Sequence, residues 1–308
     1  MADFQKESEM MEIALVSGES RYENVARALS LIEVDELKKA KRVLVKPNFT
    51  AMKRNEANTH KDALKAVLDF LRKMDKRNVT VGDGSGDAYY LGGTTEEAFR
   101  RAGVDELCRE YEVELRDFNQ GEYAELMEVK TNFGNVRIRV VKDFFLYDYV
   151  ISLTLPKTHD YALATLSMKN MMGVIHPADR LKVHGVRAVV DALLYDRCVR
   201  LINVNLFEFF KKVKPNLSVI DGFCGMEGEG PVNGDVVECG WALASTNPLL
   251  ADVVGVKLMG LEPREVGYIH YMLEEQKCEI PDDVLKKIEK LKRKFRLHPR
   301  WREQKGWE

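Results

Sequence analysis

Closely spaced cysteines are missing from this sequence. The five cysteines lie at positions 108, 198, 224, 239 and 278, and the two nearest are 15 residues apart. Disulfide frameworks, zinc ribbons and ferredoxin-type clusters all depend on cysteines at short or regular spacing. We therefore expect no disulfide and no iron–sulfur cluster bound by this chain alone.

Long apolar runs and an excess of positive charge are missing as well. No segment approaches the ~18 consecutive apolar residues of a membrane span, and residues 1–10 lack an apolar segment of secretory type. The 47 Lys and Arg are balanced by 49 Asp and Glu, whereas non-specific nucleic-acid binding needs surplus cations. We expect a cytoplasmic protein with neither a membrane nor a nucleic acid as partner, and the oligomeric state is left open. Scarce glutamine, with four residues, beside abundant Lys, Arg and Glu hints at a thermophilic source.

Alternating strand and helix patterns run through most of the chain. Strands are expected at 12–16, 42–46, 78–81, 112–118, 136–141, 149–155, 217–220 and 236–244. Helices are expected at 19–31, 62–74, 94–102, 186–212 with a break near 196–200, 249–259, 263–275 and 282–295. This alternation predicts an α/β fold with a mainly parallel or mixed sheet flanked by helices.

No Ser-, Gly- or Pro-rich linker divides the chain. We expect one α/β domain over residues 12–296. A boundary between two lobes near residue 150, with a cleft between the lobes, is left open. Residues 1–11 and 297–308 show little periodicity and are expected to be peripheral termini.

Polar residues gather where the predicted strands end. Lys46-Pro47-Asn48, Asp83-Gly84-Ser85-Gly86, Pro156-Lys157-Thr158-His159 and Asp221-Gly222 each follow an apolar strand. Ligands of open α/β sheets bind beyond the C-terminal ends of the strands. We therefore expect Asn48, Asp83, Lys157 and Asp221 to open onto one cleft. The glycine turn could equally be a plain strand-to-helix turn, and the two lysines could be solvated surface residues.

Residues 156–184 carry three of the six histidines, with spacings of 17 and 8 that match no metal-binding signature. Apolar Met168, Met171 and Met172 are interleaved with the polar residues and would fix them in place. The alternative is a polar loop with one structural histidine. A second segment, 221–234, holds five glycines together with carboxylates, and it predicts either a ligand loop or an ordinary turn.

Ordered blocks of this chain resemble a prokaryotic family known as domain of unknown function 362. The blocks are V-L-V-K-P-N at 43–48, T-H at 59–60, G-D-G-S-G at 82–86, L-P-K-T-H at 155–159, L-S-M-K-N-M-M-G at 166–173, I-D-G-F-C-G-M-E-G-E-G-P-V-N-G at 220–234 and N-P-L-L-A-D-V-V-G-V-K-L-M-G-L at 247–261. Many relatives carry an added ferredoxin-like module. This chain lacks that module, so the resemblance implies no electron-transfer role.

The layout is also distantly similar to the nickel-pincer lactate racemase family. In that family a glycine turn with a histidine and a later His/Lys segment flank a two-lobed cleft. Here Asp87-Ala88-Tyr89 stands where that family would offer a catalytic histidine, so racemase chemistry is not carried over.

The leading hypothesis is an enzyme acting on a small anionic metabolite, a carboxylate or a phosphate, by acid/base chemistry that a divalent metal could assist. An imidazole titrates near neutrality, which suits His159 to general acid/base work. The catalytic candidates are His159, Lys157 and Asp83; the substrate-binding candidates are Lys46, Asn48, Ser85, Gly86, Lys169 and Asn170; the candidate metal ligands are Asp221 and Glu227.

Two further readings stay open. A cofactor could be linked to Lys157 or Lys169. Alternatively, the chain could be a non-catalytic binding or scaffold protein for a metal or an iron–sulfur assembly. Catalysis would require His159 within hydrogen-bond reach of a substrate atom or an acidic partner.

Overall fold

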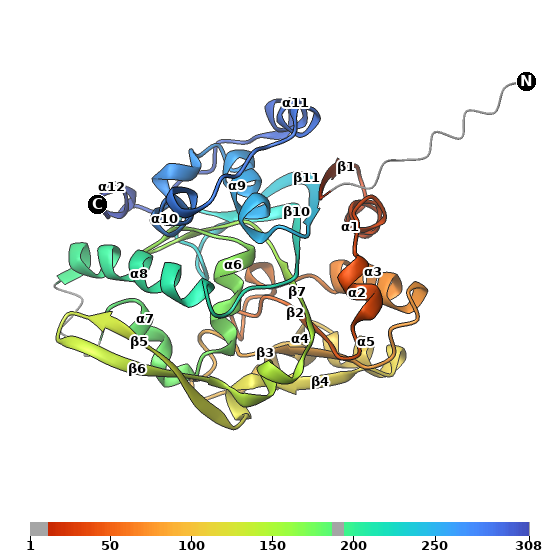
Figure 1. Ribbon diagram of the computed structural model, residues 1–308, viewed down its shortest axis with the longest axis horizontal. Helices are drawn as coiled ribbons and strands as arrows, with labels where there is room; N and C mark the ends of the chain where they lie inside the picture. Colours follow the sequence, from red (N-terminus) through yellow and green to blue (C-terminus); the bar gives the residue numbers. More distant parts are fainter. Residues whose placement is uncertain (1–11, 187–193, 308) are drawn as a thin grey trace, which may run out of the picture.

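One mixed sheet organises the computed structural model, which describes residues 12–186 and 194–307. Its main strands lie in the order β1–β11–β10–β7–β2–β3–β4 (Figure 1). All run parallel except β11, which is antiparallel to both of its neighbours. Their bounds are β1 Ile13–Ser17, β2 Val43–Lys46, β3 Val79–Asp83, β4 Glu114–Asp117, β7 Tyr149–Thr154, β10 Leu217–Glu227 and β11 Asp235–Ser245. The structure confirms the α/β fold with a mixed sheet flanked by helices.

Two apolar cores lie on the two faces of this sheet. Successive side chains of a strand point to opposite faces, so Val43 and Val45 join one core while Leu44 joins the other. The first core is covered by α1 Arg21–Ser30, α2 Asp35–Lys39, α3 Lys61–Lys73, α4 Thr95–Arg101 and α5 Val104–Tyr111. The second is covered by α6 Ser167–Asn170, α7 Arg180–Val183, α8 Tyr195–Phe210, α9 Pro248–Leu258, α10 Gly267–Glu275 and α11 Asp282–Leu291 (Figure 1). Burial on both sides explains why β7 is buried at every position.

Local sequence signals set where several helices begin. Thr94 caps α4 and Glu97 reaches back to it, forming a capping box. Ser20 caps α1 through its side chain, which accepts a hydrogen bond from the Glu23 backbone. In the described part of the chain, no helix is both long and apolar enough to span a bilayer.

Several segments depart from the expected elements; helices α2 and α5, for example, were not expected. The predicted strand at 136–141 is β6 (Gly134–Val141), but it pairs with an unforeseen strand, β5 (Tyr123–Thr131), outside the main sheet. Seven of the nine positions in β5 are partly buried or exposed, which blurs its alternation pattern. Helix α8 runs unbroken through 196–200, where we expected a break. Part of the predicted 186–212 helix, residues 187–193, lies outside the described residues.

The first half of the glycine-rich segment 221–234 is strand rather than loop. Strand β10 continues to Glu227 because its residues up to that point pair with β11. A register shift between Gly222 and Cys224 bends the ladder without ending it.

The sheet is continuous across residue 150, since β7 pairs with β10 on one side and β2 on the other. The described chain therefore has no lobe boundary at that point. The C-terminal tail is not peripheral, which corrects the expectation for 297–308. Trp307 is 4% exposed and Gln304 is 1% exposed, and the Gln304 amide donates to the Tyr195 hydroxyl. Of the expected peripheral N-terminus, residues 1–11 lie outside the described residues.

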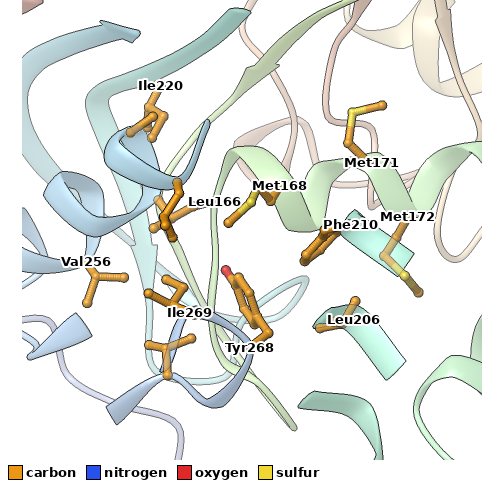
Figure 2. Close-up of a cluster of buried hydrophobic side chains, with 14 of the residues drawn as sticks. Leu166, Met168, Met171, Met172, Leu206, Phe210, Ile220, Val256, Tyr268 and Ile269 are labelled. Carbon is orange, nitrogen blue, oxygen red and sulfur yellow. The ribbon is translucent and has the colours of Figure 1, made fainter. Parts of the chain in front are cut away.

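The short helix α6 is held by an apolar cluster on one side and by a carboxylate at its start. Figure 2 shows Met168 of α6 and Met172, which follows α6, on the side that faces Phe210 and Leu206 of α8 and Tyr268 of α10. The Asp252 carboxylate of α9 accepts hydrogen bonds from the backbone N–H groups of Ser167 (2.8 Å) and Met168 (3.1 Å). These contacts fix the orientation of a helix that also carries Lys169 and Asn170.

Candidate active site

A cavity of about 450 Å³ opens beyond the C-terminal ends of β2, β3 and β7. The chain adds β3 and β4 on one side of β2, then returns to add β7 and β10 on the other side. Ligands of open α/β sheets bind where the strand order reverses in this way. The expected residues that line the cavity are Lys46, Asn48, Asp83, Gly86, His159, Lys169 and Asn170.

An ion pair joins the ends of β2 and β3 at the floor of the cavity. Lys46 Nζ lies 2.6 Å from Asp83 Oδ1, and both side chains are almost fully buried. Asp83 Oδ2 accepts a hydrogen bond from the Phe49 backbone at 2.7 Å. Burial lowers the pKa of Lys46, and the Asp83 charge opposes that shift. The glycine at 173 is required here, because a Cβ atom would lie 2.0 Å from Asp83 Oδ1.

Asn170 ties this pair to the neighbouring strands. Its Oδ1 accepts from Lys46 Nζ and Asn48 Nδ2, each at 3.0 Å. Its Nδ2 donates to the Lys46 carbonyl and to Ser152 Oγ, also at 3.0 Å. Lys46, Asn48 and Asn170 therefore satisfy one another, and their polar groups form the rigid floor of the cavity.

We expect Lys46→Met to lower the stability of the protein strongly. The variant leaves the Asp83 carboxylate buried without its cation, a change that typically costs about 3–5 kcal/mol. The matched control is Lys38→Met, because Lys38 and Asp35 form an ion pair at the same 2.6 Å but with both side chains more than half exposed. Denaturant unfolding should show a large loss for the first variant and little change for the second. Equal losses would contradict this account of the floor.

Lys157 lies beneath the cavity rather than in its wall, which corrects its expected catalytic role. Its side chain is 0% exposed and is absent from the lining. Its Nζ donates to Asn48 Oδ1 (2.7 Å), Thr50 Oγ1 (2.8 Å) and the Ala57 carbonyl (2.8 Å). Burial and the positive charge of Lys169 hold its pKa well below the usual range. Lys157 is a structural tie between β8 (Lys157–His159) and the segment after β2.

The glycine turn after β3 is not a phosphate cradle. The backbone N–H groups of residues 84–87 are all used within the protein, by Asp83, Thr95, Phe49 and Thr50. Ser85 is 0% exposed and does not line the cavity. The turn is a tight strand-to-helix connection that brings Asp83 and Gly86 to the wall, and Ser85 does not reach a ligand from its buried position.

Asp221 and Glu227 also lie away from the cavity lining. Asp221 shares a face of β10 with Val219, so it points toward α1, where Arg21 Nε lies 3.0 Å from Asp221 Oδ2. Burial raises the pKa of Asp221 to about 6, and Arg21 opposes the shift. Glu227 accepts from the Arg296 backbone at 2.9 Å. Each carboxylate is engaged with an arginine, and neither faces the cleft.

A tight turn fixes His159 in one tautomer. β8 pairs with β9 (Leu163–Thr165), and the turn between them brings the backbone N–H groups of Tyr161 (2.9 Å) and Ala162 (3.1 Å) onto His159 Nδ1. A nitrogen that accepts these bonds carries no proton, so the neutral ring carries its proton on Nε2. Burial and the charge of Lys169 hold the pKa of His159 well below its usual range. Asp160 Oδ1 also lies 3.1 Å from His159 Nδ1. The two backbone N–H groups already use the lone pair of that nitrogen, so Nδ1 has no proton to donate to the carboxylate.

His184 has the opposite tautomer and was not among the expected site residues. Its Nδ1 lies 2.9 Å from the Arg180 carbonyl, which can only accept, so Nδ1 is protonated and Nε2 has a free lone pair. Its ring stacks on His159 with centroids 5.7 Å apart. Burial lowers the pKa of His184 to about 3. The only sequence signal was its place as the last of the three histidines in 156–184.

Lys169 and Thr165 present polar groups to the cavity with no partner in the described part of the chain. Lys169 is 7% exposed and makes no hydrogen bond or ion pair there, while the buried Thr165 Oγ1 also lacks a hydrogen-bond partner. Burial lowers the pKa of Lys169 to about 8, although the charge of Asp160 favours protonation. Buried polar groups are normally satisfied, so exceptions call for an explanation such as a ligand.

We expect Lys169→Met to stabilise the protein at pH 7. A lysine pKa lowered from 10.5 to about 8 means that folding opposes its protonation, a penalty of roughly 1–3 kcal/mol that is fully present below pH 8. The gain should shrink as pH rises from 8 toward 10.5, where the free amine is neutral in both states.

The matched variant is Lys157→Met, which removes three buried hydrogen bonds and leaves the Ala57 carbonyl without its lysine donor, so it should lower stability by about 2–4 kcal/mol. Thermal melting at pH 7 and pH 10 measures both changes. A destabilised Lys169→Met protein at pH 7 would contradict the assignment of Lys169 as an uncompensated cation.

Metal ligands are not clustered in the described residues. No group of three or more His, Cys, Asp or Glu side chains is placed there to hold a metal ion. None of the five cysteines is in a disulfide within the described residues, and burial raises the pKa of Cys108 and Cys239 to about 12. The expectation of a divalent metal stays a prediction. The described residues do not supply a set of ligands for it.

Comparison with known proteins identifies the family. A family model described as a domain of unknown function, DUF362, matches residues 43–257. The chain belongs to this family. The thylakoid-associated protein sll1697 of Synechocystis sp. is 26% identical over 232 residues, which are 75% of this DUF362 chain and 66% of that protein. The chain thus spans just under two thirds of that relative.

A solved structure shares the fold. The lactate racemase apoprotein from Thermoanaerobacterium thermosaccharolyticum superposes with a TM-score of 0.53 and 16% identity, over 80% of this chain and 56% of the racemase chain. The distant structural similarity to that family is confirmed. At this identity the match supports the fold alone.

Proposed function

We propose that this DUF362 chain is an enzyme that binds a small anionic metabolite, a carboxylate or a phosphate, and moves a proton at that metabolite. One observation carries the proposal. The same cavity is lined by the Lys169 ammonium and the Thr165 hydroxyl, which have no hydrogen-bond partner within residues 12–186 and 194–307, and by the imidazoles of His159 and His184. The floor beneath them is rigid and already hydrogen-bonded, so these groups are the ones left for a ligand.

The anion would bind at Lys169 and Thr165. A charge-assisted hydrogen bond from a buried ammonium is among the stronger polar contacts in proteins. Neutralising Lys169 also removes the positive charge that lowers the pKa of both imidazoles. Ligand binding would thus raise the basicity of His159 and His184 toward the range useful for proton transfer.

The two imidazoles would have different tasks. His159 can offer a proton from Nε2, because its Nδ1 accepts from the backbone. His184 can accept one at Nε2, because its Nδ1 faces a carbonyl. A donor and an acceptor on the same cavity wall suit general acid/base chemistry, with His159 in the role that we assigned from the sequence.

We expect anion binding to weaken as pH rises through about 8. The ammonium of Lys169 is the binding form, and its pKa is about 8, so affinity should be constant below pH 7 and fall toward tenfold per unit above pH 9. Butanoate, which stays ionised over this range, can be titrated against the protein by NMR. Lys169→Met should bind weakly at every pH. Affinity that rises with pH, or a Lys169→Met protein that binds like the wild type, would contradict the site.

We expect His159→Gln to bind acids but to lose turnover. General acid/base catalysis typically contributes about 10²–10⁴-fold, so proton exchange should fall by at least about a hundredfold. The measurement is loss of C–H signals from a panel of small carboxylic acids in D₂O, followed by ¹H NMR. His176→Gln is the control, because His176 lies in the same segment but does not line the cavity. Equal turnover in the His159 variant and the wild type would remove His159 from the chemistry.

A lysine-linked cofactor is a second candidate, favoured by the state of Lys169. Lys157 is saturated by three hydrogen bonds, whereas Lys169 is unpartnered and its lowered pKa leaves some free amine near neutrality. His184 Nε2 could add one ligand to a metal, but the described residues offer no set of three. A metal here would therefore have to bring its other ligands with it. Intact mass spectrometry of Lys169→Met and wild-type protein from the native host would reveal such an adduct.

The scaffold alternative and the cytoplasmic location remain proposals of lower rank. A scaffold protein would use the cavity to bind a ligand but would transfer no proton. The comparison of His159→Gln with the wild type therefore separates a scaffold from an enzyme. Fractionation of native cells would locate the protein, and its relative's name makes a membrane-bound fraction worth including.

A further inference from the structure

The mouth of the cavity differs in character from its interior. Tyr90 and Leu181 line the cavity and are 50% and 42% exposed. They come from the turn after β3 and from α7, while Pro231 and Val232 join the lining from the connection between β10 and β11. Apolar side chains from three separate segments thus lie at the opening, beside the exposed polar residues Glu229 and Asn233.

The interior is polar and cationic. Lys169, His159 and Thr165 are each less than 10% exposed. The difference in exposure places the anion-binding groups deep and the apolar side chains at the entrance. A ligand that fills both regions must carry its charge at one end.

The size of the cavity also indicates a ligand larger than a two- or three-carbon acid. A volume of about 450 Å³ falls within the range of roughly 300–1,000 Å³ that proteins use for ligands of drug size. A two- or three-carbon acid would occupy only the deep end and leave apolar surface at the mouth in water. Covering that surface would increase affinity, since burial of apolar area is favourable.

Negative groups at the wall restrict the far end of the ligand. Asp87 and Glu229 line the cavity, and Glu229 is exposed. A second carboxylate near them would meet like charge, which disfavours binding. The wall therefore favours an acid that is charged at one end only.

We propose that the ligand is an amphipathic monoanion, with a carboxylate or phosphate head at Lys169 and an apolar body of about four or more carbons lying between Tyr90, Leu181 and Val232. This inference rests on the proposed anion site and names the class of molecule that it takes.

Calorimetric titration with acetate, butanoate, hexanoate and octanoate at pH 7 tests the inference. We expect one-to-one binding that tightens by roughly three- to fourfold per methylene beyond butanoate, the change that corresponds to ~0.8 kcal/mol per buried CH₂. Hexanedioate should bind more weakly than hexanoate. Leu181→Gln and Val232→Thr should each flatten this dependence on chain length. Leu285→Gln should not, because Leu285 is similarly exposed but lies on α11 away from the cavity.

The outcomes separate the two proposals. Carboxylates that need Lys169 but bind with the same affinity at every chain length would overturn the amphipathic ligand and leave the anion site standing. Chain-length dependence that survives in Lys169→Met, Leu181→Gln and Val232→Thr alike would place the acids elsewhere and overturn the inference. No binding of any carboxylate or of inorganic phosphate by the wild type would overturn both.

Discussion

The Lys46–Asp83 ion pair joins the ends of two parallel strands inside the protein, and the cavity is built around it. Burying two charges is unfavourable unless each finds a partner and its remaining hydrogen bonds are made. Here the carboxylate also accepts from the Phe49 and Gly84 backbone, and the ammonium also donates to Asn170. The segments after β2 and β3 are held in one arrangement as a result, which gives the cavity a firm floor.

Three buried lysines beside this floor have three different states. Lys46 has a carboxylate, Lys157 has three neutral acceptors, and Lys169 has no partner among the described residues. Partnered cations stabilise the surrounding backbone, whereas an unpartnered one lowers stability until something binds it. The contrast separates structural lysines from the one available to a ligand, although all three look alike in the sequence.

Much of the fold followed from the sequence, because strand and helix periodicities are local. Apolar runs predicted β7 and the first four residues of β10, and the helical pattern of residues 94–102 predicted α4. The hairpin strand β5 was missed because its side chains are only partly buried.

The site was predicted less completely than the fold. The expectation that it lies beyond the strand ends follows from a topological rule, and seven of the candidate residues line the cavity there. Lys157 and Asp221 were misplaced because side-chain direction depends on which face of the strand meets a helix. His184 was overlooked because its tautomer is set by a contact with the Arg180 carbonyl, and that contact is visible only in the structure.

The order in which the chain is made has a consequence for this architecture. In the described chain β1 pairs only with β11, and the N-terminus of α6 is closed by Asp252 of α9. Contacts between residues so far apart in sequence form slowly, since a long loop must close first. During synthesis the helix that presents Lys169 lacks its cap until residue 252 has emerged from the ribosome. The nascent chain therefore completes the candidate site only after residue 252 is made, when most of the sheet is available to receive it.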